Sequence, residues 1–278
     1  MTKTFVDSFL FFNEVELLKV RLAYLGPIIE SFIVIESNID FSGKSKPYIL
    51  EQYLLELPFA NKIIYFKTDI NLRNFSWALK KIRWMTRPSK FLWKIQDFQR
   101  NAIREAIRTN IKVIPDYILM GDLDEIPNYQ TLDSIRSGKI VVNEVNSLRQ
   151  RLFNYRTDIS TREEEWYGTL LLSGNVFFDK LPHVWRSLRE DLPFIQNGGF
   201  HLSYFMPTDK IHKKLQAISD VENLGEFKKL NIRQINEAIS IGNDIFGRDI
   251  GLTQQNGMIP NDLEEILQKY LPNQVIKN

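Results

Sequence analysis

The stretch YILMGDLDEIP, residues 117–127, places three carboxylates directly after an apolar run. The apolar run is short, as in a buried strand. Asp122 and Asp124 follow it one residue apart, where the chain would leave the strand. In open parallel sheets, ligands bind beyond the carboxyl ends of the strands. If the neighbouring strands are parallel, this stretch predicts a ligand site at the edge of the sheet.

Strands and helices alternate before this stretch. Apolar runs rich in β-forming residues predict three strands at Thr4–Phe12, Ser31–Ser37 and Asn61–Lys67. Asn13 and Glu16 form a capping-box pattern that predicts a helix after the first strand. Asp97–Asn110 has the apolar spacing of a second helix, with Phe98 on its buried side. The alternation predicts an α/β fold, with an open, mostly parallel twisted sheet and helices on both faces.

The pattern changes after Pro127. Residues 139–155 and 197–205 are typical of strands, and residues 166–178 predict a hairpin or two short strands around Gly174. Three helical patterns follow from Thr208 to the end of the chain. Because no linker divides the sequence, we expect one domain over residues 1–278. Its parts are an alternating α/β half, a strand-rich half and a helical part, over residues 1–127, 128–207 and 208–278.

The composition limits the class of protein. The chain of 278 residues is 44% hydrophobic and 25% charged, with a net charge of +2 and no cysteine. It can therefore bury a substantial core, and it has no disulfide, thiolate metal site or catalytic cysteine. Asp7 and Glu14 interrupt the N-terminal apolar run, which argues against a signal peptide, and no run approaches the ~18 residues of a membrane span. We expect a cytoplasmic protein.

Two carboxylates one residue apart at a strand end suit a hard divalent cation. Mg²⁺ and Mn²⁺ prefer oxygen ligands and usually keep waters and substrate phosphates in their coordination shell. Asp122 and Asp124 therefore predict a cation that links the protein to a diphosphate. The alternative is an acidic turn that faces water. The sequence has neither a P-loop nor the GxGxxG pattern of dinucleotide enzymes.

Several segments, in this order and spacing, resemble glycosyltransferase family 17. They are DSFLFFNEVELLKVRL, IVIESNIDFSGKSKP, FQRNAI, GDLDEIP, NGGFHLSYF, KIHKKLQ and GNDIFGRD. The resemblance implies a GT-A fold, with residues 1–127 as the nucleotide-sugar-binding half and residues 128–207 as the acceptor half. It also implies a UDP-linked sugar donor, a Mn²⁺ or Mg²⁺ ion, and inversion at the anomeric carbon. The family includes an enzyme that adds N-acetylglucosamine to glycoproteins, so the resemblance favours that sugar. It favours a glycan or a lipid-linked oligosaccharide as the acceptor.

The resemblance also assigns residues. Asp122 and Asp124 match the D-x-D motif of the family, and His201 matches a motif histidine that would complete the metal shell. From the residues alone, a lone histidine in a strand is more often a core residue. Lys214 matches a family lysine that could reach the diphosphate, although a helix lysine is usually only solvated.

Strand ends predict the rest of the donor site. A nucleotide would lie where the first two strands end, and the polar residues there are Asn13, Glu36, Ser37 and Asn38. Arg100 and Asn101 lie on the helix near this edge, and an arginine can hold phosphate as a charged fork. With Asp122 and Lys214 they complete the predicted donor-binding set.

Inversion needs one general base to take the proton of the acceptor hydroxyl. Glu165, next to Trp166, is the favoured carboxylate and Asp191 is the second candidate, while the alternative for both is a plain surface charge. Trp166, Tyr167 and Tyr204 are the residues expected to bind the acceptor. Core packing is the alternative role for these aromatic residues.

Residues 73–94 carry seven basic residues and no acidic one, interleaved with tryptophan. This segment could contact an anionic membrane surface from the cytoplasmic side, which would suit a lipid-linked acceptor. It could also be a solvated face. Two rival functions remain open, a nucleic-acid-binding module that uses this segment and a metal-dependent nucleotidyltransferase. The first lacks a nucleic-acid-binding signature and leaves the carboxylates unexplained, so we expect no nucleic-acid partner.

Overall fold

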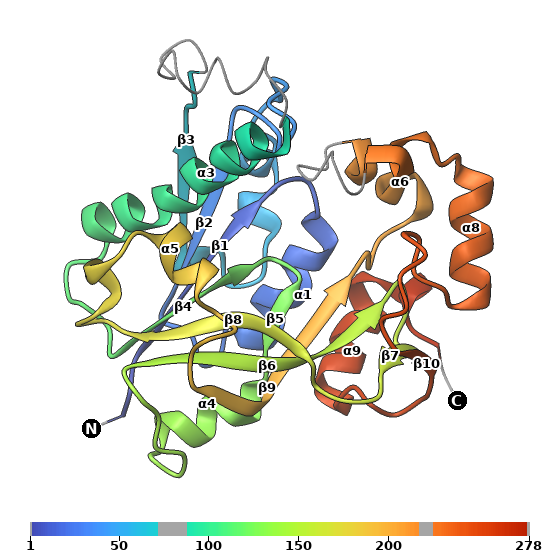
Figure 1. The fold of residues 1–278 in the computed structure, drawn as a ribbon. Coiled ribbons are helices and arrows are strands. Elements are labelled where there is room, and N and C mark those ends of the chain that lie inside the picture. The colour runs from blue at the N-terminus through green and yellow to red at the C-terminus, as the bar shows by residue number, and fades with distance from the viewer. Residues whose placement is uncertain (1, 72–87, 217–224, 277–278) are drawn as a thin grey trace.

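A mixed β-sheet forms the centre of the computed structural model, which describes residues 2–71, 88–216 and 225–276 (Figure 1). The strands are ordered β10-β7-β6-β8-β4-β1-β2-β3, and β9 pairs with both β5 and β6. Their bounds are β1 Phe5–Phe11, β2 Ser31–Ser37, β3 Ile63–Thr68, β4 Tyr117–Asp122, β5 Glu125–Pro127, β6 Val145–Asn154, β7 Ile159–Thr161, β8 Trp166–Ser173, β9 Phe194–Ser203 and β10 Leu252–Gln254.

Helices cover both faces of this sheet (Figure 1). Their bounds are α1 Val15–Leu25, α3 Pro88–Asn110, α4 Tyr129–Arg136, α5 Pro182–Ser187, α6 Thr208–Gln216, α8 Ile232–Ile241 and α9 Asn261–Tyr270. Helices α3 and α5 pack on one face in one hydrophobic core. Helices α1, α4 and α9 pack on the other face in a second core. The expected α/β fold with an open sheet and helices on both faces is confirmed.

The first four long strands are parallel, as the alternation predicts. β1 lies between β2 and β4, and β3 pairs with the outer side of β2. Leu10 in β1 is aligned with Asp122 in β4, and Phe11 is aligned with Glu36 in β2. The carboxyl ends of the three strands therefore meet at one edge of the sheet, where the predicted site lies.

The other half of the sheet is mainly antiparallel. β8 lies between β4 and β6 and runs antiparallel to both. The prediction of a hairpin around Gly174 is wrong, because one long strand ends at Ser173 and a 3₁₀ turn follows it. At Gly174 a Cβ atom would lie 2.1 Å from the carbonyl oxygen of Pro115, so the close backbone approach requires glycine.

Two details of the helices also differ from prediction. The N-cap of α1 is Glu14 and not Asn13, and no side chain caps this helix through a hydrogen bond. The Glu14 carboxylate instead accepts a hydrogen bond from the backbone N–H of Asn13. In α3, Phe98 is 51% exposed, whereas Ile95 and Ile103 are buried.

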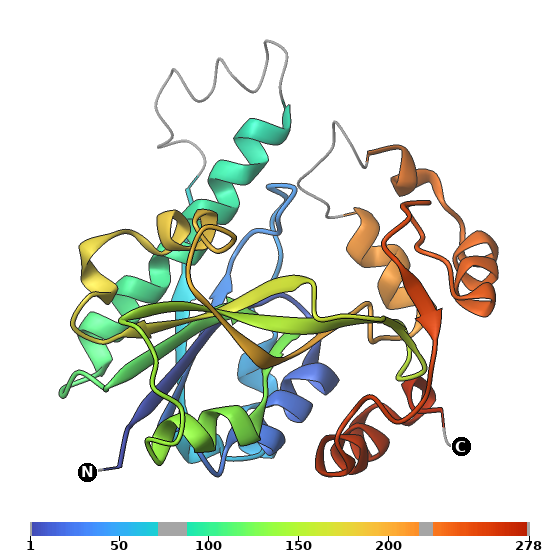
Figure 2. The same ribbon diagram turned by 60° about the horizontal axis from the view of Figure 1, so that its bottom comes forward.

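The C-terminal part of the chain is joined to both the sheet and the core. β10 pairs with β7 at the edge of the sheet, and α9 packs against α1. Helices α6 and α8 form a third hydrophobic cluster with Tyr155 and Ile159. This cluster lies beside the sheet, away from α3 (Figure 2). Among the residues that the structure describes, none of the helices has the length and apolar character to cross a membrane.

Candidate active site

A fully buried ion pair positions the turn between β4 and β5. The guanidinium of Arg21 binds both carboxylate oxygens of Asp7, and each of the two bonds is 2.8 Å long. Its Nη1 also donates to the carbonyl oxygens of Asp122, Leu123 and Glu125, at 2.8, 3.1 and 2.9 Å. Buried charges are rare unless they are paired. This pair therefore fixes the backbone that carries the three carboxylates.

Asp122 lies between two arginines from different helices. Its Oδ1 accepts a hydrogen bond of 2.7 Å from Arg100 in α3, and its Oδ2 accepts one of 3.0 Å from Arg186 in α5. Burial acts to raise the pKa of Asp122, but the charges of Arg186 and Arg100 outweigh it and lower the pKa to about 2. The carboxylate is therefore ionised at neutral pH.

Glu125 is completely buried and links the turn to the second half of the sheet. Arg186 binds both of its carboxylate oxygens, with a distance of 2.8 Å from Nη1 to Oε2. Trp166 Nε1 donates to Oε1 at 2.8 Å, and the backbone N–H of Asp122 donates to Oε2 at 2.9 Å. These contacts make Glu125 a positioning residue.

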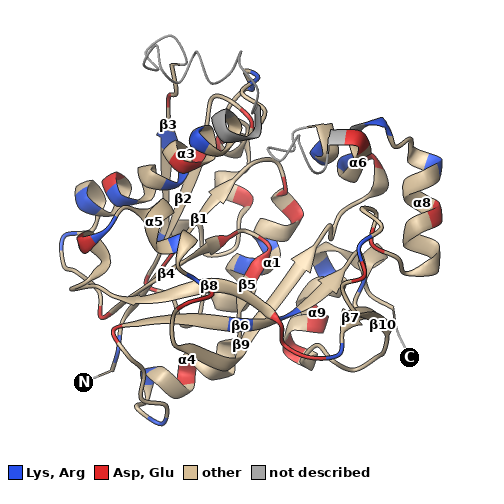
Figure 3. Cartoon of the chain, viewed as in Figure 1, with Lys and Arg blue, Asp and Glu red and all other residues tan. Residues whose placement is uncertain are grey.

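Asp124 faces a different set of partners. Its Oδ2 lies 3.4 Å from Lys214 Nζ in α6, and its Oδ1 lies 3.8 Å from His201 Nε2 in β9. Burial acts to raise the pKa of Asp124, but Lys214 and His201 hold the pKa well below its ordinary value. Lys214 also pairs with Glu14 at 3.2 Å. The structure therefore brings Lys214, His201 and the Asp pair together at one edge of the sheet. Helices α3 and α6 each carry several lysine or arginine residues (Figure 3).

His201 is held in place by strand pairing. It is aligned with Glu125 in the β5–β9 ladder, and its ring centre lies 4.4 Å from that of Trp166. Gly199 has a φ of +145°, and a Cβ atom there would lie 2.2 Å from the carbonyl oxygen of Ile126. The glycine thus permits close backbone pairing within the sheet. His201 is only 9% exposed, and its Nδ1 has no hydrogen-bond partner.

The strand-end residues predicted to bind the nucleotide already have protein contacts. Both oxygens of Glu36 accept hydrogen bonds, and the donors are Lys46, the backbone N–H groups of Ile49 and Leu50, and Tyr65. Ser37 and Asn38 accept hydrogen bonds from nearby backbone N–H groups. Asn101 accepts one from the N–H of His183. Among these predicted nucleotide-binding residues, Asn13 alone has a buried side-chain oxygen without a partner.

The two predicted base residues lie on the surface, whereas two of the three predicted acceptor residues line a cavity. Glu165 and Asp191 are both exposed. Tyr167 packs edge-on against Phe194, with 6.1 Å between the ring centres. Trp166 and Tyr204 line one cavity with His201. The pKa of Tyr204 is raised to about 12 by burial.

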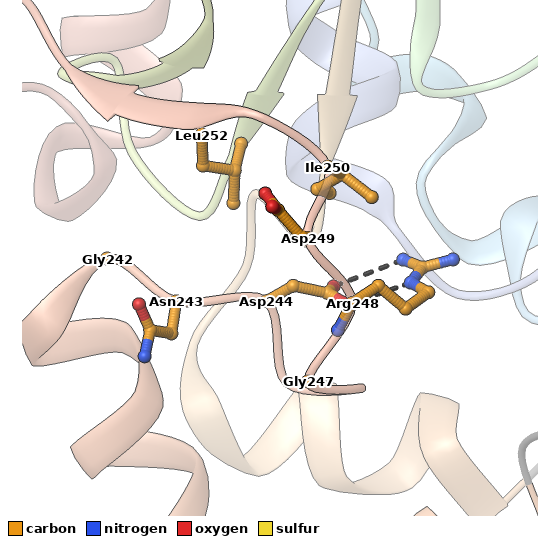
Figure 4. Close-up of a pocket in the computed structure, with 8 residues that line it drawn as sticks. All are labelled: Gly242, Asn243, Asp244, Gly247, Arg248, Asp249, Ile250 and Leu252. Atoms are coloured by element: carbon orange, nitrogen blue, oxygen red, sulfur yellow. Dashed lines mark hydrogen bonds and ion pairs between the residues drawn. The ribbon is translucent and has the colours of Figure 1, made fainter.

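That cavity, which we call the β9 cavity, has a volume of about 220 Å³. It is lined by Leu152, Asn154, Trp166, His201, Ser203, Tyr204, Asp244, Phe246, Arg248 and Ile250. A second cavity, of about 300 Å³, lies along the loop of residues 242–252 (Figure 4). Asp244, Arg248 and Ile250 line both cavities. Arg248 is fixed by two bonds of 2.7 and 3.1 Å to the Asp244 carboxylate.

Within residues 2–71, 88–216 and 225–276, no group of three or more histidine and acidic side chains is arranged to hold a metal ion. The expected set of Asp122, Asp124 and His201 therefore does not form a ready-made cage. Asp124 and His201 approach each other, whereas both oxygens of Asp122 contact arginines.

A match to a family model shows which protein family the chain belongs to. The model described as glycosyltransferase family 17 matches residues 1–250. The chain belongs to glycosyltransferase family 17. It is therefore a glycosyltransferase, an enzyme that moves a sugar from a nucleotide-sugar donor to an acceptor. The resemblance seen in the sequence is confirmed.

The solved structures that resemble this family 17 chain have low sequence identity to it and low TM-scores. A homologue of Mycobacterium tuberculosis Rv0371c from Mycobacterium sp. strain JC1 is 12% identical, with 85% of this chain and 98% of that chain covered and a TM-score of 0.36. 4-diphosphocytidyl-2C-methyl-D-erythritol synthase from Anaerococcus prevotii is 8% identical, with 70% and 87% covered and a TM-score of 0.37. Apo glycosyltransferase GlyE of Streptococcus pneumoniae is 9% identical, with 100% and 46% covered and a TM-score of 0.31. Likenesses this weak carry no argument about the site, and no curated protein sequence matches significantly.

Sequence reasoning missed three residues of this family 17 site. Arg186, Arg21 and the buried role of Glu125 become visible only in the structure. One signal was available, because Asp7 is a charge inside an otherwise apolar strand and requires a buried partner. The basic segment of residues 73–94 lies largely outside the described residues, so its predicted membrane contact stays a prediction.

Proposed function

We propose that this family 17 enzyme transfers N-acetylglucosamine from a UDP-linked donor to a hydroxyl group of a glycan or lipid-linked oligosaccharide, with a divalent cation and with inversion. One observation carries the proposal. Two ionised carboxylates, Asp122 and Asp124, lie at the carboxyl edge of the parallel strands among Arg100, Arg186 and Lys214. This edge is where α/β sheets bind ligands, and its cations suit a diphosphate.

The side chains at this edge fit a Mn²⁺ or Mg²⁺ ion that is shared with the substrate. Such ions are commonly held by one or two carboxylates together with substrate phosphates, and not by a protein cage. The absence of a three-ligand group among the described residues agrees with that mode. Asp124 and His201 would hold the ion, and Asp122 would complete the set if an arginine moved to the diphosphate. When bound, the ion would neutralise charge that develops on the leaving diphosphate.

The protein itself supplies the other charges. Lys214 and Arg100 touch the aspartates through their cationic groups, so each could turn to a phosphate oxygen when the donor binds. Asn13 has a buried side-chain oxygen without a partner near the end of β1, and it is our candidate for the uridine. Glu36, Ser37 and Asn38 would support the nucleotide site by holding the adjoining loop.

A single displacement accounts for inversion. The acceptor oxygen attacks the anomeric carbon as the bond from that carbon to the diphosphate breaks, and the hydroxyl proton passes to a carboxylate. We assign this base to Glu165, which directly precedes Trp166 and has no hydrogen bond through its side chain among the described residues. Asp191, in the turn after α5, is the second candidate.

The acceptor class determines where the enzyme would work. A lipid-linked acceptor would place it at the cytoplasmic face of a membrane, with residues 73–94 as the contact. The test is binding to anionic liposomes before and after the triple change Lys80→Glu, Lys81→Glu and Arg83→Glu. Binding that only the wild-type chain shows would support the contact, whereas a wild-type chain that does not bind would refute it.

A thermal-shift screen of nucleotide sugars, with and without Mn²⁺, tests the proposed function. We expect UDP-N-acetylglucosamine to raise the melting temperature only when Mn²⁺ is present, and Asp124→Ala to abolish this rise. Slow release of N-acetylglucosamine and UDP would confirm sugar chemistry and exclude nucleotidyl transfer. Asp133→Ala is the matched control, because Asp133 is an exposed carboxylate on α4.

Two results would contradict the proposal. One is full Mn²⁺-dependent stabilisation of Asp124→Ala by the UDP-sugar. The other is a wild-type enzyme that no nucleotide sugar stabilises under any metal condition.

A further inference from the structure

Arg189 is a cation beside the active-site carboxylates that takes no part in the displacement proposed above. It lies in the turn after α5, three residues beyond Arg186. Its guanidinium lies over the ring of Trp166, with Cζ 5.7 Å from the ring centre, which is within the range of a cation–π contact. The same indole donates to Glu125 at 2.8 Å and contacts the ring of His201. A single indole ring therefore connects Arg189 to the centre of the site.

The ion pairs of Arg189 differ from those of the other cations at the site. Arg100, Arg186 and Lys214 each pair with a carboxylate of the site. A phosphate that recruits one of them takes it from that carboxylate, and breaking a buried pair such as those of Arg186 is costly. Among the described residues, the one ion pair of Arg189 is with Glu190, at 3.4 Å. The Glu190 side chain is 68% exposed, and a surface pair of this kind contributes little. Arg189 can therefore bind an anion at little cost.

The charges around Arg189 also favour an anion. Burial and the neighbouring charge of Arg186 lower the pKa of Arg189, and the attractions of Glu125 and Asp122 offset this only in part. A guanidinium nevertheless stays protonated in a protein, so the two arginines repel each other. The Arg189 side chain is 28% exposed, which leaves N–H groups accessible from solvent. An anion bound there would relieve the repulsion through charge-assisted hydrogen bonds.

We propose that Arg189 binds a phosphate group of the substrate through its guanidinium, while Trp166 holds the guanidinium in place. This inference rests on the proposed function and adds a binding residue to it. The planar fork of an arginine matches two oxygens of one phosphate. Under the proposed function the phosphate has two possible sources, the diphosphate of the donor and the phosphate of a lipid-linked acceptor.

Calorimetric titration of the full chain in the presence of Mn²⁺ tests this assignment and separates the two sources. UDP and pyrophosphate probe the donor side, with uridine as the phosphate-free comparison. N-acetylglucosamine 1-phosphate at saturating UDP probes the acceptor side, with methyl N-acetylglucosaminide as its phosphate-free comparison. Arg189→Gln should weaken binding roughly tenfold for the phosphate probes of one side, through the lost charge-assisted bonds, and should leave both phosphate-free compounds unchanged. Arg189→Lys keeps the charge without the fork and should lose less.

Arg233→Gln is the matched control. Arg233 is 87% exposed on α8, so this variant has the same change in net charge and should bind every probe as the wild-type chain does. The assignment is overturned if Arg189→Gln binds all phosphate probes as tightly as the wild-type chain. It is also overturned if the variant loses phosphate-free and phosphate-bearing compounds alike, or if the wild-type chain binds no phosphate probe. Pyrophosphate binding that depends on Arg189, without any binding of UDP, would instead refute the proposed donor and leave the phosphate site standing.

Discussion

Arg21 and Asp7 form a completely buried bidentate pair, and Arg21 extends from it to three carbonyl oxygens of the turn that carries the aspartates. The pair joins α1 to β1, whereas the carbonyls belong to the turn after β4. The position of Asp122 and Asp124 therefore depends on a charge that lies beneath the site and does not reach the substrate.

Arg21→Met should destabilise the protein by about 3–5 kcal/mol, because it leaves the Asp7 carboxylate buried without a partner. Urea unfolding measures the change. The double variant Asp7→Leu with Arg21→Met removes both charges and should lose less stability than Arg21→Met alone. Equal stability of Arg21→Met and the wild-type chain would show that the pair does not hold the turn.

Arg186→Lys should lower sugar transfer or donor hydrolysis roughly 100-fold, in the range found when reacting groups are misplaced by about 1 Å. Arg186 contacts Glu125 through both Nη1 and Nη2 and Asp122 through Nη2, and a lysine cannot make this planar fork. The measurement is UDP release at saturating donor. Arg233→Lys, an exposed arginine on α8, is the matched control and should keep full activity.

The stability of the protein should fall steeply in acid because of Asp122 and Asp124. Both have a pKa lowered in the folded state, to about 2 for Asp122. The stabilisation that they contribute is complete above the pKa of about 4 that an aspartate has in the unfolded chain. It is lost as the pH falls toward their lower pKa values in the folded protein. Urea unfolding should therefore show that the free energy of unfolding falls between pH 5 and pH 2, and that it falls less in Asp124→Asn. Asp133→Asn should follow the wild-type curve, and an identical slope for Asp124→Asn would refute this link.

The edge of the sheet was predictable from sequence because its signals are local. The apolar runs that form β1, β2 and β4 are short and bounded, and the rule that ligands bind at their carboxyl ends placed the aspartates correctly. The contact between Arg186 and Glu125 was not predictable, since it joins residues 61 positions apart through a short helix. The hairpin prediction failed because β8 finds its partners in β4 and β6 and not in the residues after Gly174.

Asp7 shows how a site feature can be present in the sequence and still be misread. Within the apolar run at the N-terminus it argued only against a signal peptide. In the structure it is the buried partner of Arg21, fourteen positions along the chain. The pairing could not be derived from the pattern, because helix α1 also offers Lys19 and only the packing of α1 on β1 selects Arg21.

Tyr155→Phe should loosen the loop that closes the β9 cavity. The buried Tyr155 hydroxyl donates to the carbonyl oxygen of Asn243 at 3.1 Å and accepts from the N–H of Ile245 at 2.8 Å. Its removal leaves both backbone groups without this partner, so we expect a loss of about 1–2 kcal/mol in the free energy of unfolding. Asp244 lies between these two residues and lines the cavity with Trp166 and Tyr204, so a methyl glycoside used as a simple acceptor should also bind more weakly, while UDP binding stays unchanged.

Urea unfolding, glycoside titration by NMR and UDP thermal shift on the same variant separate these effects. Tyr270→Phe is the matched control, since Tyr270 lies on α9, outside both cavities, and should change stability by no more than about 0.5 kcal/mol. A Tyr155→Phe protein that binds the glycoside as tightly as the wild-type chain would show that the loop does not shape the cavity. An equal loss of UDP binding would show that the hydroxyl supports the whole site and not the acceptor side alone.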